Sequence, residues 1–284
     1  MATATVNGLT LAYETIGEEG RPWVITPGGR FTKDEPGVRE LAEALAAQGN
    51  RVLIWDRPNC GESDVCFEGS SESAMQADAL VGLLEHLDMT PAVIIGGSGG
   101  ARVSLLAAAQ PGAASGLAIW WISGGVYGLL TLAMHYCGGS LAAAWTSGGM
   151  EAVADLPEWQ EVTEKNAGNR QRILDQDPKA FIAAMERWML AYVPTDEPVP
   201  GLSLAAARAL DIPALVFRSG ESDVWHTRAT SERLAAVLPQ ARLVEPPWGD
   251  REWLERQDHH DDGIFVRWPL LAPQLLEWQA GALG

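Results

Sequence analysis

Residues 92–109 read AVIIGGSGGARVSLLAAA. The first four are apolar and typical of a buried strand, whereas the small residues after position 100 have the composition of a closely packed helix. Between them GGSGG (96–100) fits the pattern G-x-S-x-G, in which a serine stands on a sharp strand-to-helix turn. Because such a turn strains the backbone and needs small neighbours, the glycines favour Ser98 as a nucleophile.

The start of the following helix adds to this chemistry. Its backbone N–H groups and its positive dipole end point toward the turn. The N–H of Gly99 can therefore hold an oxyanion beside Ser98. The alternative is that the glycines bind a phosphate or make a turn of no chemical consequence. Phosphate binding is disfavoured, because no Lys-Ser or Lys-Thr pair follows the glycines.

Strands and helices alternate through most of the chain. Two alternating runs around Asn7-Gly8 predict an antiparallel hairpin at the start. Beyond it, apolar runs and stretches of helical spacing indicate an α/β fold with a mostly parallel sheet and helices on both faces. The predicted strands are 23–26, 51–55, 92–95, 117–122, 214–218 and 242–245, and the predicted helices are 36–48, 73–87, 101–109, 228–237 and 269–279.

The segment 124–202 interrupts this alternation with helical patterns that no strand separates. We predict a helical cap here, inserted into a core made of residues 1–123 and 203–284. The cap should lie over the carboxyl ends of the strands, where open α/β sheets bind ligands. Trp188 belongs to one of its apolar helical stretches, and we predict that Trp188 contacts a compact hydrophobic substrate.

Two further segments carry a family resemblance. Pro-Gly-Gly at 27–29 resembles a His-Gly-x oxyanion loop, and residues 56–64 resemble a D-x-P/R-x-x-G-x-S loop at the end of a strand. With the Ser98 turn they make the chain similar, over essentially its whole length, to the α/β-hydrolase superfamily. The resemblance implies that the N–H of Gly29 is the second oxyanion donor. Pro27 replaces the family's histidine, a departure that leaves backbone donation intact.

Arg30 directly follows this loop. It could reach into the pocket to meet a substrate carboxylate or enolate. The alternative is a solvated loop residue paired to an acid. Asp56 and Arg57 are interpreted as structural residues that fix the strand-end loop.

A serine nucleophile needs a base, and the base needs an orienting carboxylate, in the chain order Ser, acid, His. Asp223 resembles the acid of the family's G-x-x-D loop after the penultimate strand. The family usually carries a Gly-His pair after the last strand, but Asp250 occupies that position here. A carboxylate there cannot shuttle protons near neutral pH unless burial raises its pKa considerably.

Three arrangements of the base remain open. His226 lies three residues after Asp223 and could reach the nucleophile, with Asp223 or Asp250 orienting it. His259 or His260 could come from the loop after the last strand. In the third arrangement no base is present, and the domain binds a ligand or does other chemistry.

These residues predict a serine hydrolase that cleaves a small, largely apolar carboxylic ester or lactone through an acyl-enzyme on Ser98. One alternative is a carbon–carbon bond hydrolase of the meta-cleavage-product type, with Arg30 facing a substrate carboxylate. Another is a non-catalytic small-molecule binder on the same fold. Serine in place of aspartate as the nucleophile disfavours epoxide and haloalkane chemistry.

The chain has 284 residues and a formal net charge of −17, which disfavours nucleic acid and anionic lipid as partners. Residues 1–12 lack the features of an export signal, and no apolar run is long enough to span a membrane, so we expect a cytoplasmic protein. The three cysteines show no metal-ligand spacing, and we expect neither a metal nor an organic cofactor. A small-molecule substrate is the expected partner, and a homodimer is compatible with the sequence.

Overall fold

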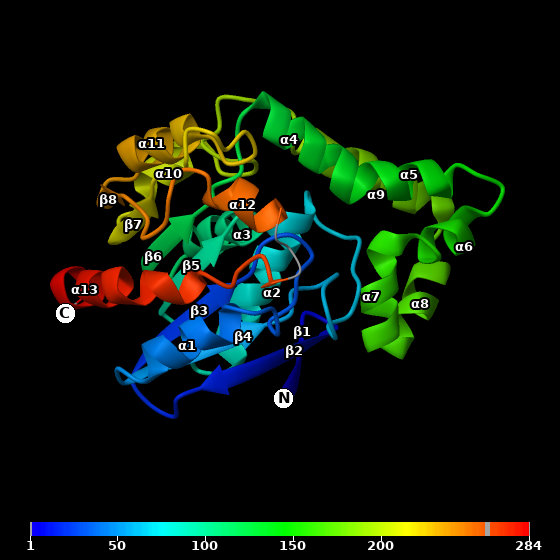
Figure 1. The fold of residues 1–284 in the computed structure, drawn as a ribbon. Helices are drawn as coiled ribbons and strands as arrows, with labels where there is room; N and C mark the ends of the chain where they lie inside the picture. Colours follow the sequence, from blue (N-terminus) through cyan, green and yellow to red (C-terminus); the bar gives the residue numbers. More distant parts are fainter. Residues whose placement is uncertain (1, 259–261, 284) are drawn as a thin grey trace.

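A computed structural model describes residues 2–258 and 262–283. At its centre is an eight-stranded sheet in the order β1-β2-β4-β3-β5-β6-β7-β8 (Figure 1). β1 and β2 form the predicted hairpin, with Asn7 and Gly8 at positive φ in its turn, and β2 runs antiparallel to β4. The other neighbouring pairs are parallel, which confirms the predicted sheet. The strands are β1 (Ala2–Val6), β2 (Leu9–Ile16), β3 (Arg21–Thr26), β4 (Asn50–Trp55), β5 (Ala92–Gly97), β6 (Ala114–Trp120), β7 (Ala214–Phe217) and β8 (Ala241–Val244).

Helices cover both faces of this sheet. Successive strand residues point to opposite faces, so Val24 belongs to one buried apolar cluster, whereas Trp23 and Ile25 belong to another. One face is covered by α2 (Glu72–His86), α3 (Gly99–Ala108), α10 (Leu204–Ala209) and α11 (Arg228–Val237), and the other by α1 (Val38–Ala46), the 3₁₀ helix η3 (Trp268–Leu271) and α13 (Ala272–Ala282).

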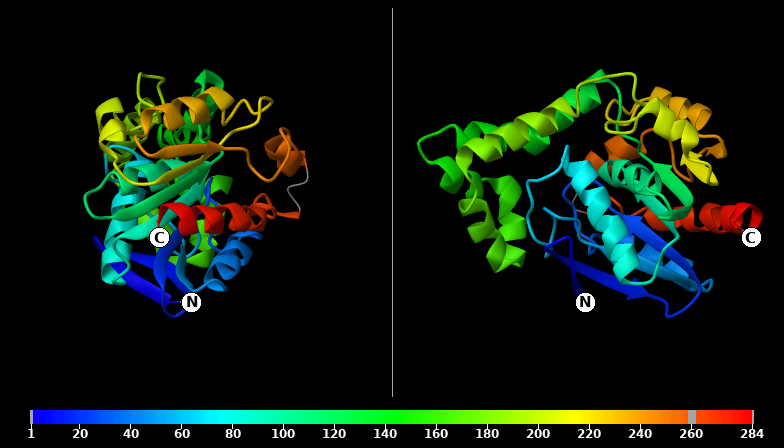
Figure 2. Two further views of the ribbon diagram at one scale, coloured as in Figure 1. Left: turned by 90° about the vertical axis from the view of Figure 1, so that its left-hand side faces the viewer. Right: turned by 180° about the vertical axis from the view of Figure 1, so that it is seen from behind.

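Between β6 and β7 the chain forms a run of helices that we call the helical insertion (residues 126–190). Its apolar side chains make a third buried cluster, to which the loop after β4 contributes Phe67. The insertion extends from the core on the side away from α13 (Figure 2). It consists of α4 (Val126–Ala133), the π-helix η1 (Met134–Gly138), α5 (Gly139–Ala144), α6 (Gly149–Ala154), α7 (Pro157–Lys165), α8 (Ala167–Leu174) and α9 (Pro178–Leu190).

Two details near the end of the chain depart from the predicted elements. The loop after β8 contains a further helix, α12 (Glu252–Asp258), which the sequence pattern did not predict. The last α-helix begins three residues later than predicted, because residues 268–271 form the η3 turn around Pro269. Among the described residues, no helix combines the length and apolar character that crossing a membrane requires.

Candidate active site

Ser98 stands on the turn between β5 and α3. Its backbone has φ 56° and ψ −123°, a conformation that L-residues rarely adopt. Close packing explains the glycines around it. A Cβ at Gly96 would lie 2.8 Å from the Gly100 carbonyl group, and a Cβ at Gly100 would lie 2.0 Å from the Thr26 carbonyl oxygen. The turn therefore accepts only glycine at these two positions without a backbone shift.

Three polar side chains meet at this turn. Ser98 Oγ lies 2.9 Å from His226 Nε2, and His226 Nδ1 lies 2.9 Å from Asp223 Oδ2. All three residues are at least 93% buried. A hydroxyl, an imidazole and a carboxylate in this order form a chain along which a proton can move from the serine to the imidazole.

Asp223 and His226 belong to one loop, between β7 and α11. Asp223 Oδ1 accepts the backbone N–H groups of Trp225 and His226, each at 2.9 Å, so the carboxylate also determines the shape of its own loop. The imidazole packs edge-to-face against Trp253, with ring centroids 4.4 Å apart. Hydrogen bonds at both ring nitrogens and an aromatic contact thus hold His226 in one orientation.

Asp250 does not join this group. Its carboxylate accepts the backbone N–H groups of Glu221 and Ser222 and lies 3.2 Å from Arg228 Nη2. These contacts, the Glu221 N–H first, hold the pKa of Asp250 below its ordinary value. The prediction of a catalytic or orienting role is therefore corrected: the side chain is exposed and ties down the loop that precedes Asp223. His259 and His260 lie outside the described residues.

The loop after β3 lies directly against the serine. A Cβ at Gly28 would lie 2.7 Å from Ser98 Cβ, and a Cβ at Gly99 would lie 3.3 Å from the Gly29 nitrogen. Gly29 has φ 53°, in the left-handed region that glycine adopts readily. The Gly29 nitrogen therefore lies beside Gly99, and Gly28 packs on Ser98, an arrangement that is compatible with an oxyanion site.

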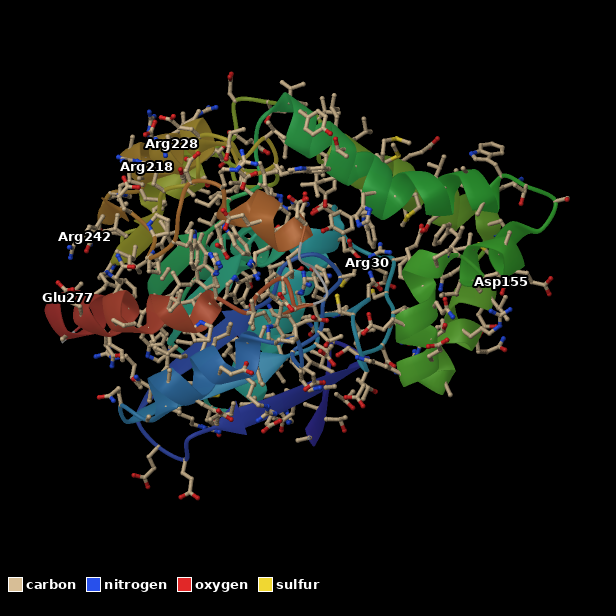
Figure 3. The ribbon with its side chains drawn as sticks, viewed as in Figure 1. Arg30, Asp155, Arg218, Arg228, Arg242 and Glu277 are labelled. Carbon is tan, nitrogen blue, oxygen red and sulfur yellow. The ribbon has the colours of Figure 1, made fainter. Side chains whose placement is uncertain are left out.

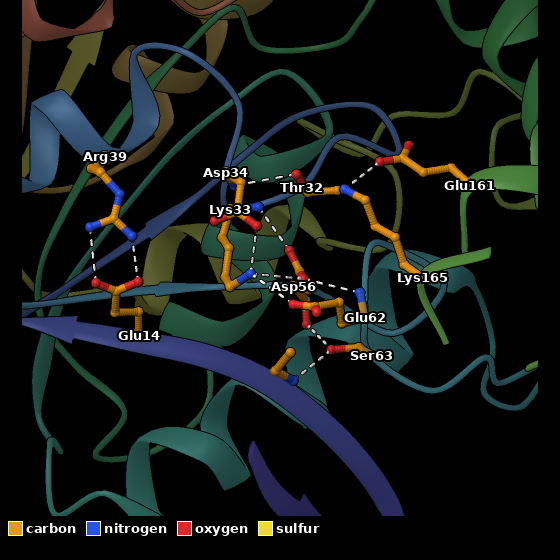
Figure 4. Close-up of polar contacts among 11 residues, drawn as sticks. Glu14, Thr32, Lys33, Asp34, Arg39, Asp56, Glu62, Ser63, Glu161 and Lys165 are labelled. Carbon is orange, nitrogen blue, oxygen red and sulfur yellow. Dashed lines mark hydrogen bonds and ion pairs between the residues drawn. The ribbon is translucent and has the colours of Figure 1, made fainter. Parts of the chain in front are cut away.

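A buried ion pair anchors the far end of the same loop (Figure 4). The backbone N–H of Lys33 donates to Asp56 Oδ1 at 2.8 Å, and Lys33 Nζ lies 3.4 Å from Asp56 Oδ2. The ammonium group also contacts Asp34 and Glu62. Burial raises the pKa of Asp56, whereas its hydrogen bonds and the Lys33 charge act in the opposite direction. Asp56 therefore joins the end of β4 to the loop that carries Gly29.

A cavity of about 250 Å³ opens onto Ser98 and His226. Core loops, the helical insertion and α12 all contribute to its wall. None of its lining residues in the described part of the chain is an Asp, Glu, Lys or Arg. Burial lowers the pKa of His135 in this wall, with a smaller effect from the nearby Arg30 charge. The remaining lining residues are Gly29, Phe31, Thr131, Leu132, Tyr136, Trp225, Trp253, Gln257, Ile264 and Phe265.

Arg30 does not reach this cavity wall, contrary to the contact predicted for it. Its Nη2 donates to the Tyr136 carbonyl oxygen at 3.0 Å and lies 3.5 Å from Glu72 Oε1. The guanidinium lies 4.0 Å from the ring centroid of Trp159. In Figure 3 Arg30 lies at the junction between the core and the helical insertion, so it connects these two parts.

Trp188 is fully buried inside the helical insertion and does not line the cavity. Its ring packs against Phe67, with centroids 6.3 Å apart. The predicted substrate contact is therefore wrong, because the apolar face of α9 packs against other helices of the insertion. The insertion instead presents Thr131, Leu132, His135 and Tyr136 to the cavity. Thr131 and His135, and likewise Leu132 and Tyr136, are four residues apart, a spacing from which the sequence could have predicted that they share one helix face.

The sheet, the turn at Ser98 and the cavity at the carboxyl ends of the strands define an α/β hydrolase. The chain belongs to the alpha/beta hydrolase family, since a family model with that description matches residues 22–275. Membership supports a hydrolase as the class of enzyme and does not specify a substrate.

Solved structures of the same fold include several hydrolases. The enol-lactonase from Burkholderia xenovorans is 21% identical, with a TM-score of 0.59 over 98% of this chain and 100% of that chain. A thermophilic esterase from Thermogutta terrifontis is 20% identical, with a TM-score of 0.60 over 99% of this chain and 98% of that chain. A meta-cleavage product hydrolase from Pseudomonas fluorescens is 18% identical, with a TM-score of 0.58 over 99% and 98%.

Proposed function

We propose that the chain is a serine hydrolase that cleaves the carboxylic ester or lactone bond of a small, uncharged and largely apolar substrate. The proposal rests on the 2.9 Å contact between Ser98 Oγ and His226 Nε2 at the wall of an apolar cavity. A hydroxyl within reach of an imidazole that a carboxylate orients is the arrangement that nucleophilic acyl transfer requires. The fold that the chain shares with an esterase and an enol-lactonase is consistent with this bond class.

The first half of the reaction forms an acyl-enzyme. Ser98 Oγ bonds to the substrate carbonyl carbon while His226 Nε2 takes the hydroxyl proton. The N–H groups of Gly29 and Gly99 stabilise the negative charge on the carbonyl oxygen, and Asp223 stabilises the imidazolium. The intermediate then breaks its ester C–O bond, and the leaving oxygen takes the proton from His226. Water repeats the sequence on the acyl-enzyme and releases the acid.

The cavity limits the size and the charge of the substrate. Its volume of about 250 Å³ is slightly below the roughly 300–1,000 Å³ of typical small-molecule pockets, so it favours a compact substrate over a polymer. A charged substrate would lose its hydration on entering the cavity, and the described lining residues offer no ion pair to compensate for that cost. This disfavours the carbon–carbon hydrolase alternative, which needs Arg30 to meet a substrate carboxylate.

Hydrolysis of p-nitrophenyl acetate by purified variants tests the proposal. We expect Ser98→Ala and His226→Ala to lower kcat about 10⁴-fold or more, because the nucleophile and its base act as one unit. His86→Ala is the matched control, since His86 is exposed on α2, and it should keep the parent rate. Activity that survives Ser98→Ala would contradict the mechanism. A parent protein that neither turns over the ester nor reacts with a fluorophosphonate would favour the non-catalytic binder.

A further inference from the structure

Arg57 is a buried cation directly behind the oxyanion loop. It follows β4 by two residues and is 2% exposed. Its Nη2 donates to the carbonyl oxygens of Gly28 at 3.1 Å, Gly29 at 2.7 Å and Phe31 at 3.4 Å. The side chain therefore crosses from the loop after β4 to the loop after β3, which carries the proposed oxyanion donor.

Peptide geometry links the Gly28 carbonyl to the oxyanion donor. The C=O of Gly28 and the N–H of Gly29 belong to one planar trans peptide unit, in which the two bonds point in opposite directions. A carbonyl that Arg57 holds on one side therefore directs the Gly29 N–H to the other side. The Gly28 side of this loop packs on Ser98, since a Cβ at Gly28 would lie 3.3 Å from Ser98 Oγ. Glycine at two successive positions favours rotation of this peptide, and the Phe31 N–H, at 3.3 Å from the same carbonyl oxygen, assists Arg57 in holding it.

Arg57 has few polar partners apart from the loop carbonyls. Within residues 2–258 and 262–283 it forms no ion pair, and its Nε has no hydrogen-bond partner. Its Nη1 contacts the neutral Gln76 at 3.4 Å. A Cβ at Gly99 would lie 3.8 Å from Nη1, so the positive charge is close to both proposed donors. A fixed positive charge in a site shielded from water stabilises negative charge that develops in the transition state.

We propose that Arg57 is a positioning residue for the oxyanion hole, and this inference rests on the proposed serine hydrolase function. Its guanidinium fixes the peptide between Gly28 and Gly29 so that the Gly29 N–H points at the reacting carbonyl oxygen. Its unpaired charge strengthens that interaction when the oxygen becomes negative. Arg57 does not line the cavity at Ser98, so it acts through the loop.

The kinetics of Arg57→Gln and Arg57→Lys test this role. Because the interaction forms only in the transition state, kcat for p-nitrophenyl acetate should fall about 10²-fold in Arg57→Gln while KM changes little. Arg57→Lys keeps the charge but not the planar fork, so its kcat should lie between those of Arg57→Gln and the parent. Added ethylguanidinium should restore part of the kcat of a third variant, Arg57→Ala.

Arg102→Gln is the matched control for the loss of a buried guanidinium. Arg102 is 3% exposed and contacts Ser73 and Tyr192, not the oxyanion loop. We expect this variant to lose thermal stability and to keep its kcat. Thermal unfolding of every variant separates loss of folding from loss of rate. An equal fall in kcat for Arg102→Gln and Arg57→Gln, or no rescue by ethylguanidinium, would assign Arg57 a structural role only.

Labelling of Ser98 by a fluorophosphonate separates the two proposals. If the parent reacts and folded Arg57→Gln or Arg57→Lys reacts at the parent rate, the role of Arg57 is refuted and the hydrolase mechanism stands. If the parent itself does not react, the hydrolase mechanism fails and the inference about Arg57 fails with it. Slower labelling of both variants, in the same order as their kcat values, supports both proposals.

Discussion

At the scale of single residues, the loop that carries Asp223 and His226 depends on Asp250. The Asp250 carboxylate accepts two backbone N–H groups from residues 221 and 222, directly before Asp223. The loops also approach closely, because a Cβ at Gly220 would lie 2.0 Å from the Asp250 carbonyl oxygen. A residue in the position of the family's histidine thus supports the loop that carries Asp223 and His226 from outside the cavity.

Asp250→Asn distinguishes this support from a catalytic role. The Glu221 N–H lowers the pKa of Asp250 in the folded state below its ordinary value of 3.8. The ionised carboxylate therefore stabilises the fold fully above the unfolded pKa, and this stabilisation is lost as the pH falls through the folded pKa. We expect the variant to have a Tm a few degrees lower at pH 7. The difference should persist down to the ordinary pKa of 3.8 and shrink only as the pH falls below it, through the lowered pKa of the folded state.

Thermal unfolding at pH 7 and at a series of pH values below 3.8 measures this effect. Asp155→Asn is the control, since Asp155 is an exposed acid of the insertion that pairs with Arg170 on the surface, and its Tm should match the parent. At pH 7 the kcat of Asp250→Asn should stay within about threefold of the parent value. A loss of kcat as large as that of His226→Ala would contradict the supporting role and indicate that Asp250 takes part in catalysis.

At the scale of elements, α12 and the first helices of the insertion form the cavity wall opposite the sheet. α12 supplies Trp253 and Gln257 one helical turn apart. Its first residue, Glu252, is 2% exposed and forms ion pairs with Arg256 and Arg267. Burial raises the pKa of Glu252, an effect that the two arginines oppose. This pairing holds the helix where Trp253 closes the cavity.

Trp253→Ala should widen the range of substrates. Removal of the indole enlarges the cavity beside His226, so the ratio of kcat/KM for p-nitrophenyl hexanoate to that for the acetate should rise roughly tenfold or more. The ratio is the appropriate measurement, because lost packing on the imidazole lowers both rates together. Trp145→Ala, at a position 68% exposed on the insertion, should leave the ratio unchanged. An unchanged ratio in Trp253→Ala would show that the acyl group binds elsewhere.

At the scale of the whole molecule, Arg30 joins the loop after β3 to the helical insertion. It contacts Glu72 in the core and Tyr136 and Trp159 in the insertion. Desolvation lowers the pKa of Arg30, but the Glu72 charge and other neighbours outweigh it, so the net direction is upward. The buried cation is therefore retained in the charged form and links the two parts of the chain.

Arg30→Leu should destabilise the fold by about 3 kcal/mol, because it leaves the buried Glu72 carboxylate without its cation. Arg187→Leu is the matched control: Arg187 also bridges the two parts, through a 2.8 Å hydrogen bond to the Gly69 carbonyl, but this bond is exposed. We expect a loss below about 1 kcal/mol there. Urea denaturation measures both values, and equal losses would contradict the buried link.

The local elements of this protein follow from the sequence alone. A turn at Ser98 could be predicted because the glycines at 96 and 100 act within a few residues, and strands and helices have their own periodicities. Local patterns of this kind do not predict α12, because a short helix is stabilised by its tertiary contacts rather than by its own sequence pattern. They also do not distinguish a cavity-facing aromatic residue from a core one, as Trp188 demonstrates.

The sequence by itself determined the class of fold, the strained serine turn and a short set of candidate partners for it. Only the tertiary structure decided which of those partners meet, since hydrogen bonds such as the one between Ser98 and His226 join residues 128 positions apart. The packing of distant segments likewise places Asp250 outside the site and brings Arg57 to the loop after β3. Proximity between loops arises when strands pack side by side, and no single segment of the chain encodes that packing.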